Sequence, residues 1–315
     1  MKYYFALLFI ITIVVSSCKP SSQYENINNT KPMYGEVPKS EDYKKIDEEF
    51  IQNCLKECKT IDSAVNEHIK NAWWYFYHDS LQTAMKRFNQ VWLLNPNFPD
   101  SYFGFAALLE TQGNNSEAQR FYAMALEKDK NKDRAELCYQ RIADCKEQLK
   151  DYKGTIEAYI KISELNPKND FAFDKIGFFQ AQLGNSVEAF KAYNKALSLN
   201  PGDANTYNNR GYLNQSLKKY PDAIADYSEA IKLEPKNIRA LANRAMTGFD
   251  MKDYKRAIND FESCVQLEPK DPSLRRLLGI AKLYSKDKLG ACQEFEKAKQ
   301  LGDTIVDELI QKNCK

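Results

Sequence analysis

The side chains that could carry out catalysis or hold a metal are few and scattered in this sequence. Only two histidines occur: His68 falls at an inward position of a helical pattern and His78 in a predicted turn. Neither lies near a motif for a nucleophile or a metal cluster, and no G-x-G-x-x-G or G-x-x-x-x-G-K-S/T phosphate loop occurs. We therefore predict no catalytic residue, no cofactor and no metal site. A cryptic cell-wall enzyme remains the less favoured alternative.

The elements that position the remaining polar groups follow a period of 34 residues, which runs seven times from Val65 to Ile305 with one insertion of three residues. The eighth position of each unit is small: Ala72, Ala106, Ala143, Gly177, Gly211, Ala245 and Gly279. The twenty-fourth is aromatic: Phe88, Tyr122, Tyr159, Tyr193, Tyr227, Phe261 and Phe295. Small residues let two helices approach closely, and the aromatic is expected to fill the space between neighbouring units.

At these residues the chain resembles the tetratricopeptide repeat family, in which each repeat is a helix-turn-helix. The resemblance implies an all-α fold, a right-handed α-solenoid of seven repeats with an extra N-terminal helix and a C-terminal capping helix. The expected organisation is a signal peptide at 1–17, a lipidated tether at 18–39, a capping helix at 40–64, repeats at 65–98, 99–132, 136–169, 170–203, 204–237, 238–271 and 272–305, and a terminal capping helix at 306–315.

In this family the first helices of successive repeats line a concave groove, and in the fifth and sixth units the groove positions are polar. They hold Asn205, Asn208, Asn209, Tyr212, Arg239 and Asn243. Asparagine amides both donate to and accept from a peptide backbone, and arginine binds a carboxylate with two parallel hydrogen bonds. The resemblance thus implies a peptide-binding groove, although a merely soluble concave face remains an equal alternative.

Some members of the family bind C-terminal carboxylates through a lysine, asparagine and arginine clamp. Here Asn209 and Arg239 match that pattern, whereas Asp174, Phe178 and Asn243 depart from it, so we do not expect that clamp. A different surface lies in the first unit, at Trp73, Trp74, Phe76 and Tyr77. Core packing, proximity to a membrane and an aromatic binding patch remain open for it.

Two arginines in the fifth and sixth units are predicted to be structural. Arg210 and Arg244 stand where the family has leucine, and each is followed 16 residues later by an aspartate, Asp226 or Asp260. No other unit has either partner. We predict salt bridges between the two helices of each unit, Arg210 with Asp226 and Arg244 with Asp260.

The N-terminus indicates where the protein works. Lys2 is followed by an apolar stretch from Tyr3 to Val15 that is too short to span a bilayer and is typical of a signal peptide. The following Ser16-Ser17-Cys18 resembles a bacterial lipobox, which implies lipid modification of Cys18 and anchoring in the cell envelope. Because Lys19 rather than aspartate follows, analogy with Gram-negative lipoproteins implies the outer membrane, facing the periplasm or the cell surface. Residues 19–39 are rich in Ser, Asn and Pro, and we expect a solvated tether there.

Eight cysteines in an exported chain suggest disulfides, and a lipidated Cys18 leaves seven, an odd number. Cys292 and Cys314 lie on predicted antiparallel helices at the C-terminal end, within about two residues of alignment, so we predict a disulfide between them. Cys264 is expected in the core. Cys54 and Cys58 share a helix face, which suits packing or metal binding better than a mutual bond, but without a nearby histidine pair we do not expect a zinc site.

The formal net charge is only +2, which gives no electrostatic case for binding nucleic acid. The predicted function is a non-enzymatic, lipid-anchored scaffold that binds a protein or peptide in its groove, with no small-molecule substrate. The alternative is a structural subunit of a larger envelope assembly that contacts its neighbours through its convex or edge surface.

Overall fold

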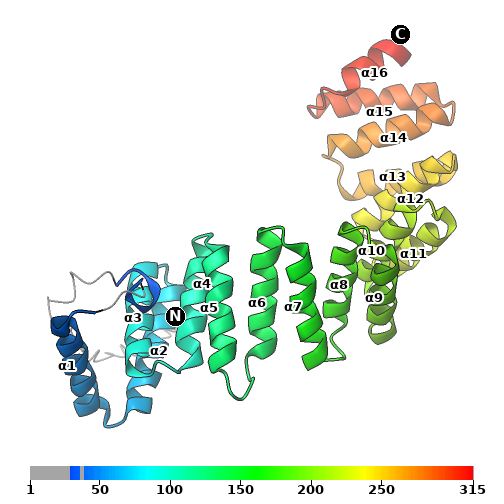
Figure 1. The fold of residues 1–315 in the computed structure, drawn as a ribbon. Helices are drawn as coiled ribbons and strands as arrows, with labels where there is room; N and C mark the ends of the chain where they lie inside the picture. The colour runs from blue at the N-terminus through cyan, green and yellow to red at the C-terminus, as the bar shows by residue number, and fades with distance from the viewer. Residues whose placement is uncertain (1–28, 36–38, 315) are drawn as a thin grey trace, which may run out of the picture. The chain divides into compact units, whose positions relative to one another are not determined.

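The computed structural model describes residues 29–35 and 39–314, and these residues form helices without a β-strand. One 3₁₀ helix, η2 (Pro32–Gly35), precedes the α-helices. They are α1 (Glu41–Cys58), α2 (Ile61–Tyr77), α3 (Leu81–Leu94), α4 (Pro99–Thr111), α5 (Asn115–Lys128), α6 (Ala135–Gln148), α7 (Tyr152–Leu165), α8 (Asp170–Gln182), α9 (Ser186–Leu199), α10 (Ala204–Ser216), α11 (Tyr220–Leu233), α12 (Ile238–Asp250), α13 (Tyr254–Leu267), α14 (Pro272–Tyr284), α15 (Lys288–Gln300) and α16 (Val306–Asn313) (Figure 1).

The helices pack as consecutive pairs within two compact units, one up to Leu149 and the other from Lys150. In the first unit α2 packs on α3 and α4 on α5, and in the second α8 packs on α9, α10 on α11, α12 on α13 and α14 on α15. Short polar caps start many of these helices: the side chains of Asn169, Asn237 and Asp253, for example, accept hydrogen bonds from backbone N–H groups of the first turn.

The periodic aromatics form the core of the pairs. All seven side chains at the twenty-fourth position are at most 1% exposed. A Cβ atom built on Gly177 would lie 2.7 Å from the Tyr193 ring, and one on Gly279 would lie 2.5 Å from Phe295. The aromatic therefore packs against the small eighth residue of its own repeat. It also reaches the next repeat, as expected: a Cβ on Gly104 would overlap the Phe88 ring, and the Tyr159 ring lies 6.1 Å from that of Phe171. Glycine at these positions leaves room for the ring.

At the N-terminal end, α1 packs against α2 and α3, where a capping helix is expected. Ser40 caps α1, since its hydroxyl accepts from the Tyr43 N–H. The expected boundary between residues 64 and 65 is wrong, because it falls inside α2. That helix begins at Ile61, where the Thr60 hydroxyl accepts from the Ser63 N–H and stops any continuation of α1.

Part of the expected solvated tether is packed on the protein. The buried side-chain amide of Asn89, on α3, donates to the carbonyl oxygens of Asn29 and Lys31, and Tyr34 is only 2% exposed. The Tyr34 ring lies 6.3 Å from that of Trp92. The sequence signal that was missed is Asn89, a polar residue on the buried face of an amphipathic helix that needs a hydrogen-bond partner.

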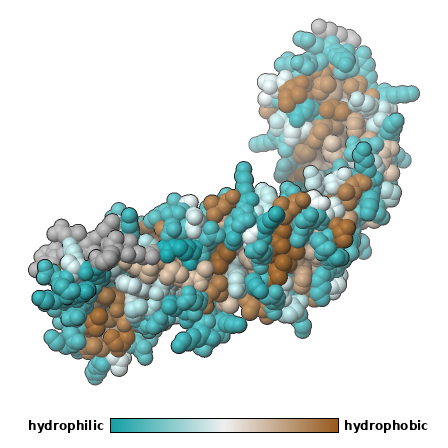
Figure 2. All heavy atoms as spheres, viewed as in Figure 1, coloured by the Kyte–Doolittle hydropathy of each residue, from teal (hydrophilic) through white to brown (hydrophobic). Residues whose placement is uncertain are grey.

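At the other end, α16 packs on α15 around Phe295, Ala298 and Val306, as the predicted terminal cap. On the face shown in Figure 2, hydrophilic residues alternate with smaller hydrophobic areas along the helices.

Candidate functional site

The predicted groove residues of the second unit come together in one cavity of about 540 Å³. They lie on the first helices of successive repeats: Asn208, Asn209 and Tyr212 on α10, and Arg239 and Asn243 on α12. The cavity is lined by Phe178, Ala181, Gln182, Tyr193, Asn208, Asn209, Tyr212, Leu213, Ser216, Ile238, Arg239, Ala242 and Asn243. Its volume is within the range of ordinary ligand pockets.

Hydrogen bonds between repeats hold the polar side chains of this cavity in place. Asn243 Nδ2 donates to Asn208 Oδ1 at 3.0 Å. Arg239 Nη2 donates at 2.9 Å to Asn205 Oδ1, which accounts for the one predicted groove residue outside the cavity lining. Each bond uses only part of the capacity of an amide or guanidinium group, so N–H groups and lone pairs remain for a ligand.

Asp174, on α8, is hydrogen-bonded to Asn209, which lines this cavity. It was not predicted as a site residue. Its Oδ1 accepts from Asn209 Nδ2 at 3.0 Å and from the Thr206 hydroxyl at 3.1 Å, and the side chain is buried. Burial raises the pKa of Asp174, and the hydrogen bonds from Asn209 and Thr206 partly oppose that rise. The departure from the family's clamp pattern at this position therefore has a local consequence, which is to fix the amide of Asn209.

The two predicted arginine–aspartate pairs are in direct contact. Arg210 Nη2 lies 2.6 Å from Asp226 Oδ1, and both Nε and Nη2 of Arg244 lie 2.8 Å from the Asp260 oxygens. Asp226 and Asp260 are 6% and 4% exposed. Each arginine also uses Nη1 to reach a polar residue of the preceding repeat, Asn194 or Ser228.

The structure joins Cys292 and Cys314 in the predicted disulfide, with Cα atoms 5.6 Å apart. Cys138, Cys145 and Cys264 are free and buried, and Cys54 is buried as well. Burial raises the pKa of Cys138, Cys145 and Cys264 to about 12, which keeps these thiols protonated and poorly reactive.

The histidines occupy structural positions. His68 is 4% exposed, and its Nε2 lies 3.5 Å from Cys54 Sγ. Burial and the nearby Arg87 charge lower the pKa of His68, so the ring is neutral at pH 7. His78 ends α2, where its Nδ1 lies 2.7 Å from the Trp74 carbonyl oxygen. Within the described residues, no group of three or more His, Cys, Asp or Glu side chains is arranged to hold a metal ion.

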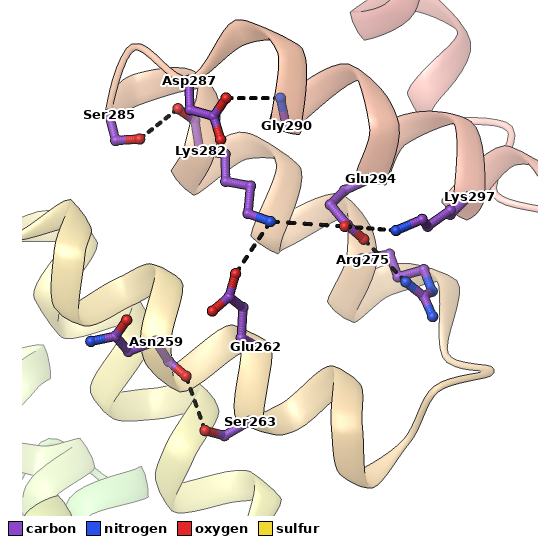
Figure 3. A network of polar contacts seen from close by, with 10 residues as sticks. All are labelled: Asn259, Glu262, Ser263, Arg275, Lys282, Ser285, Asp287, Gly290, Glu294 and Lys297. Atoms are coloured by element: carbon purple, nitrogen blue, oxygen red, sulfur yellow. Dashed lines mark hydrogen bonds and ion pairs between the residues drawn. The ribbon is translucent and has the colours of Figure 1, made fainter.

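A buried carboxylate of the last repeat, Glu294, belongs to an ion network. Glu294 lies 3.0 Å from Lys297, 3.1 Å from Arg275 and 3.8 Å from Lys282. Figure 3 shows Lys282 between Glu294 and Glu262, so the network links α13, α14 and α15. With three cations around it, Glu294 serves helix packing and is not a free acid for catalysis.

The proposed lipobox and Cys18 lie outside the described residues. Among the residues that are described, no helix is both long enough and apolar enough to cross a bilayer.

The paired helices, and the cavity that the first helices of successive repeats line, place this protein in the class of all-α solenoids built from helical repeats. Residues 204–237 match one tetratricopeptide repeat model, and residues 136–169, 172–203 and 238–271 match another. These segments are tetratricopeptide repeats, at the boundaries that the 34-residue period predicts for three of the four.

Solved structures show the same fold. A tetratricopeptide repeat protein from Parabacteroides merdae is 21% identical, with a TM-score of 0.57, and the match covers 80% of this chain and 99% of that one. The C-terminal part of a repeat protein from Cytophaga hutchinsonii has a TM-score of 0.64 at 16% identity, covering 76% and 98%. The pilF protein of Pseudomonas aeruginosa has a TM-score of 0.51 at 18% identity, covering 66% and 94%. No protein with curated annotation matches the sequence.

Proposed function

We propose that this protein is a non-enzymatic, lipid-anchored scaffold of the bacterial cell envelope that binds an extended peptide segment of a partner protein. The observation that carries the proposal is the cavity of the second unit. It brings Asn208, Asn209 and Asn243 together with Arg239 in a space of about 540 Å³. Tetratricopeptide repeats commonly bind protein segments, which agrees with this use of the groove.

The chemistry of the cavity suits a peptide better than a small metabolite. The asparagine amides can pair with successive backbone groups of an extended segment, which all carry the same donor and acceptor. Phe178, Tyr212 and Ile238 supply an apolar wall for its side chains. Arg239 is exposed and can bind a carboxylate on the segment.

The groove is tested by placing a photocrosslinking phenylalanine analogue in the full chain in cells. Tyr212 is the preferred site because it is 59% exposed and already aromatic, so the substitution preserves the fold. Lys232, on the second helix of the same repeat and with a side chain 74% exposed, is the matched control. We expect a discrete partner adduct at Tyr212 and none at Lys232. Adducts at Lys232 alone would contradict the groove and favour a structural subunit that uses its convex surface.

The anchor is tested separately by Cys18→Ser. If Cys18 carries lipid, wild-type protein incorporates an alkyne-labelled palmitate and sediments with membranes, whereas the variant does neither. Equal sedimentation of the two proteins would exclude an anchor at Cys18 without bearing on the groove.

A further inference from the structure

The first unit contains a second cavity whose chemistry differs from that of the groove in the second unit. Its volume is about 640 Å³, and its lining includes Trp73, Phe76 and Tyr77 from α2 and Phe103 from α4. The Trp73 ring lies 5.4 Å from Phe76, 6.0 Å from Tyr77 and 6.1 Å from Phe103. Asparagines and Arg239 supply much of the polar lining of the other cavity, whereas this one is lined by aromatic rings together with Glu110 and two arginines.

The aromatic wall is partly open to solvent. Tyr77 is 75% exposed and Leu137, on the facing helix α6, is 43% exposed. Phe103, by contrast, is buried at the floor. Large apolar side chains that remain accessible around a concave space are typical of binding sites, and Trp, Tyr and Arg are the residues that contribute most to binding energy at interfaces.

Two arginines stand beside the aromatic wall, and one of them has donors to spare. Arg134 is engaged by Asp100 at 2.9 Å, and its guanidinium lies 5.8 Å from the centre of the Phe103 ring. Arg141 Nη1 lies 3.7 Å from Glu110 and 3.8 Å from Asp144, too far for hydrogen bonds.

Glu110 is occupied on its other side, because its Oε2 accepts a 2.6 Å hydrogen bond from the Tyr122 hydroxyl. Its other oxygen, Oε1, is the one that lies 3.7 Å from Arg141 Nη1, too far for a hydrogen bond. A carboxylate that enters the cavity can accept two parallel hydrogen bonds from the planar guanidinium of Arg141, the bidentate geometry that arginine favours.

We propose that this cavity is a second binding site, which accepts a partner segment carrying a bulky apolar side chain next to a carboxylate. The apolar side chain enters between Trp73, Phe76 and Phe103, and the carboxylate binds Arg141. A bilayer surface is disfavoured because it contacts protruding side chains, whereas half-buried Trp73 and Phe76 line a concave space.

The site is tested by selecting a phage-displayed heptapeptide library on the full protein. We expect enriched sequences to place Phe, Trp, Leu or Ile within two positions of Asp or Glu. For an enriched synthetic peptide, Arg141→Gln should weaken binding by about tenfold or more, because a hydrogen bond to a charged group is lost. Tyr77→Ala should also weaken it. Both side chains are substantially exposed, so neither variant should unfold, and circular dichroism verifies this.

The matched control is Asn243→Ala, which changes the other cavity and should leave the affinity of this peptide within twofold of wild type. A selection without acidic residues, or binding that survives Arg141→Gln but is lost in Asn243→Ala, overturns the proposal. So does a blue shift of tryptophan fluorescence on phosphatidylethanolamine–phosphatidylglycerol vesicles that Tyr77→Ala abolishes, which assigns the surface to lipid. Failure of the groove in the second unit would not affect any of these readouts.

Discussion

The fifth and sixth repeats each contain an arginine–aspartate pair, with the aspartate buried, at two positions that are apolar in the third and fourth repeats. Arg210 and Arg244 each bind an aspartate of their own repeat and a polar side chain of the preceding one. The third and fourth repeats have Ile142 with Ala158 and Ile176 with Ala192 at the same two positions. At the same two positions, the chain therefore has an arginine–aspartate pair in two repeats and an apolar pair in two others. Replacing a buried ion pair by apolar residues is often neutral, whereas removing one partner is not.

This comparison gives the first prediction. Asp260→Ala leaves Arg244 without its carboxylate in a mostly buried position, so we expect a loss of about 2 kcal/mol in the free energy of unfolding. The double variant Arg244→Ile with Asp260→Ala has the apolar pair found at Ile176 and Ala192. Its free energy of unfolding should be within about 1 kcal/mol of wild type. Urea denaturation followed by circular dichroism measures both. Equal destabilisation of the single and double variants would show that the ion pair is not responsible.

Asp174 gives a second prediction at this scale, which depends on pH. Because burial raises the pKa of Asp174, the folded state binds more protons than the unfolded state between the ordinary aspartate pKa and the raised one. This carboxyl therefore contributes a stability that is complete at low pH and lost as pH rises through the raised pKa. Asp174→Asn keeps an oxygen acceptor for Asn209 and Thr206 without the charge. Its free energy of unfolding should exceed that of wild type at pH 7, and the difference should shrink toward pH 4. An advantage that is independent of pH would contradict this account.

At the scale of the elements, the turn between the two helices of each repeat uses one residue with positive φ. The residues are Asp79, Gly113, Lys150, Gly184, Lys218, Lys252 and Lys286, with φ between 55° and 78°. Glycine adopts this left-handed conformation readily, whereas a side chain is strained in it. Four of the seven turns nevertheless have lysine. Those at Lys218, Lys252 and Lys286, in the second unit, connect helices that pack on each other, and this packing holds the turns in place.

Lys218→Gly should therefore stabilise the protein by about 0.5–1 kcal/mol, because Lys218 is exposed and its strained backbone is relieved. The matched control is Gly184→Ala, whose added Cβ would meet no atom within 4 Å. It should lose about the same amount for backbone reasons alone. Thermal unfolding of both variants measures the pair of effects. If Lys218→Gly and Gly184→Ala both raised or both lowered the stability, backbone strain at the positive-φ position would not explain the effects.

The sequence predicted the elements well because their signals recur. The small eighth residue and the aromatic twenty-fourth placed most repeat boundaries within one residue of the observed helices, for example at Asp170 and Ala204. The groove residues Asn208 and Asn243 followed from the same register. Features that occur once were missed: the extra turn of α2 at Ile61, the packed segment around Tyr34, and the carboxylate of Asp174 under Asn209. The last two depend on contacts between residues far apart in the sequence, which have no periodic signature, and the start of α2 depends on a local cap at Thr60.

At the scale of the whole molecule, the arrangement of repeats makes stability local. A repeat contacts mainly its neighbours, so each helix pair depends on the pairs beside it. The last repeat has a neighbour on one side only, and α16 covers its other side with Val306, Leu309 and Ile310. The disulfide between Cys292 and Cys314 joins that helix to α15, and thus strengthens the end of the chain that is otherwise most prone to fray.

Replacing Cys292 and Cys314 by alanine should therefore act on one end of the molecule. The two cysteines are 22 residues apart, and a loop of this size corresponds to about 3 kcal/mol of lost loop-closure restraint. Because coupling passes between neighbours, we expect amide hydrogen exchange to accelerate in α14, α15 and α16 and to stay unchanged in α2 to α5. Hydrogen exchange read by mass spectrometry resolves these segments. Reducing the wild-type protein with dithiothreitol should reproduce the pattern, which separates the bond from any effect of the alanine side chains. Uniform acceleration along the chain would instead mean that the repeats unfold as one cooperative block, and that the disulfide stabilises all of them together.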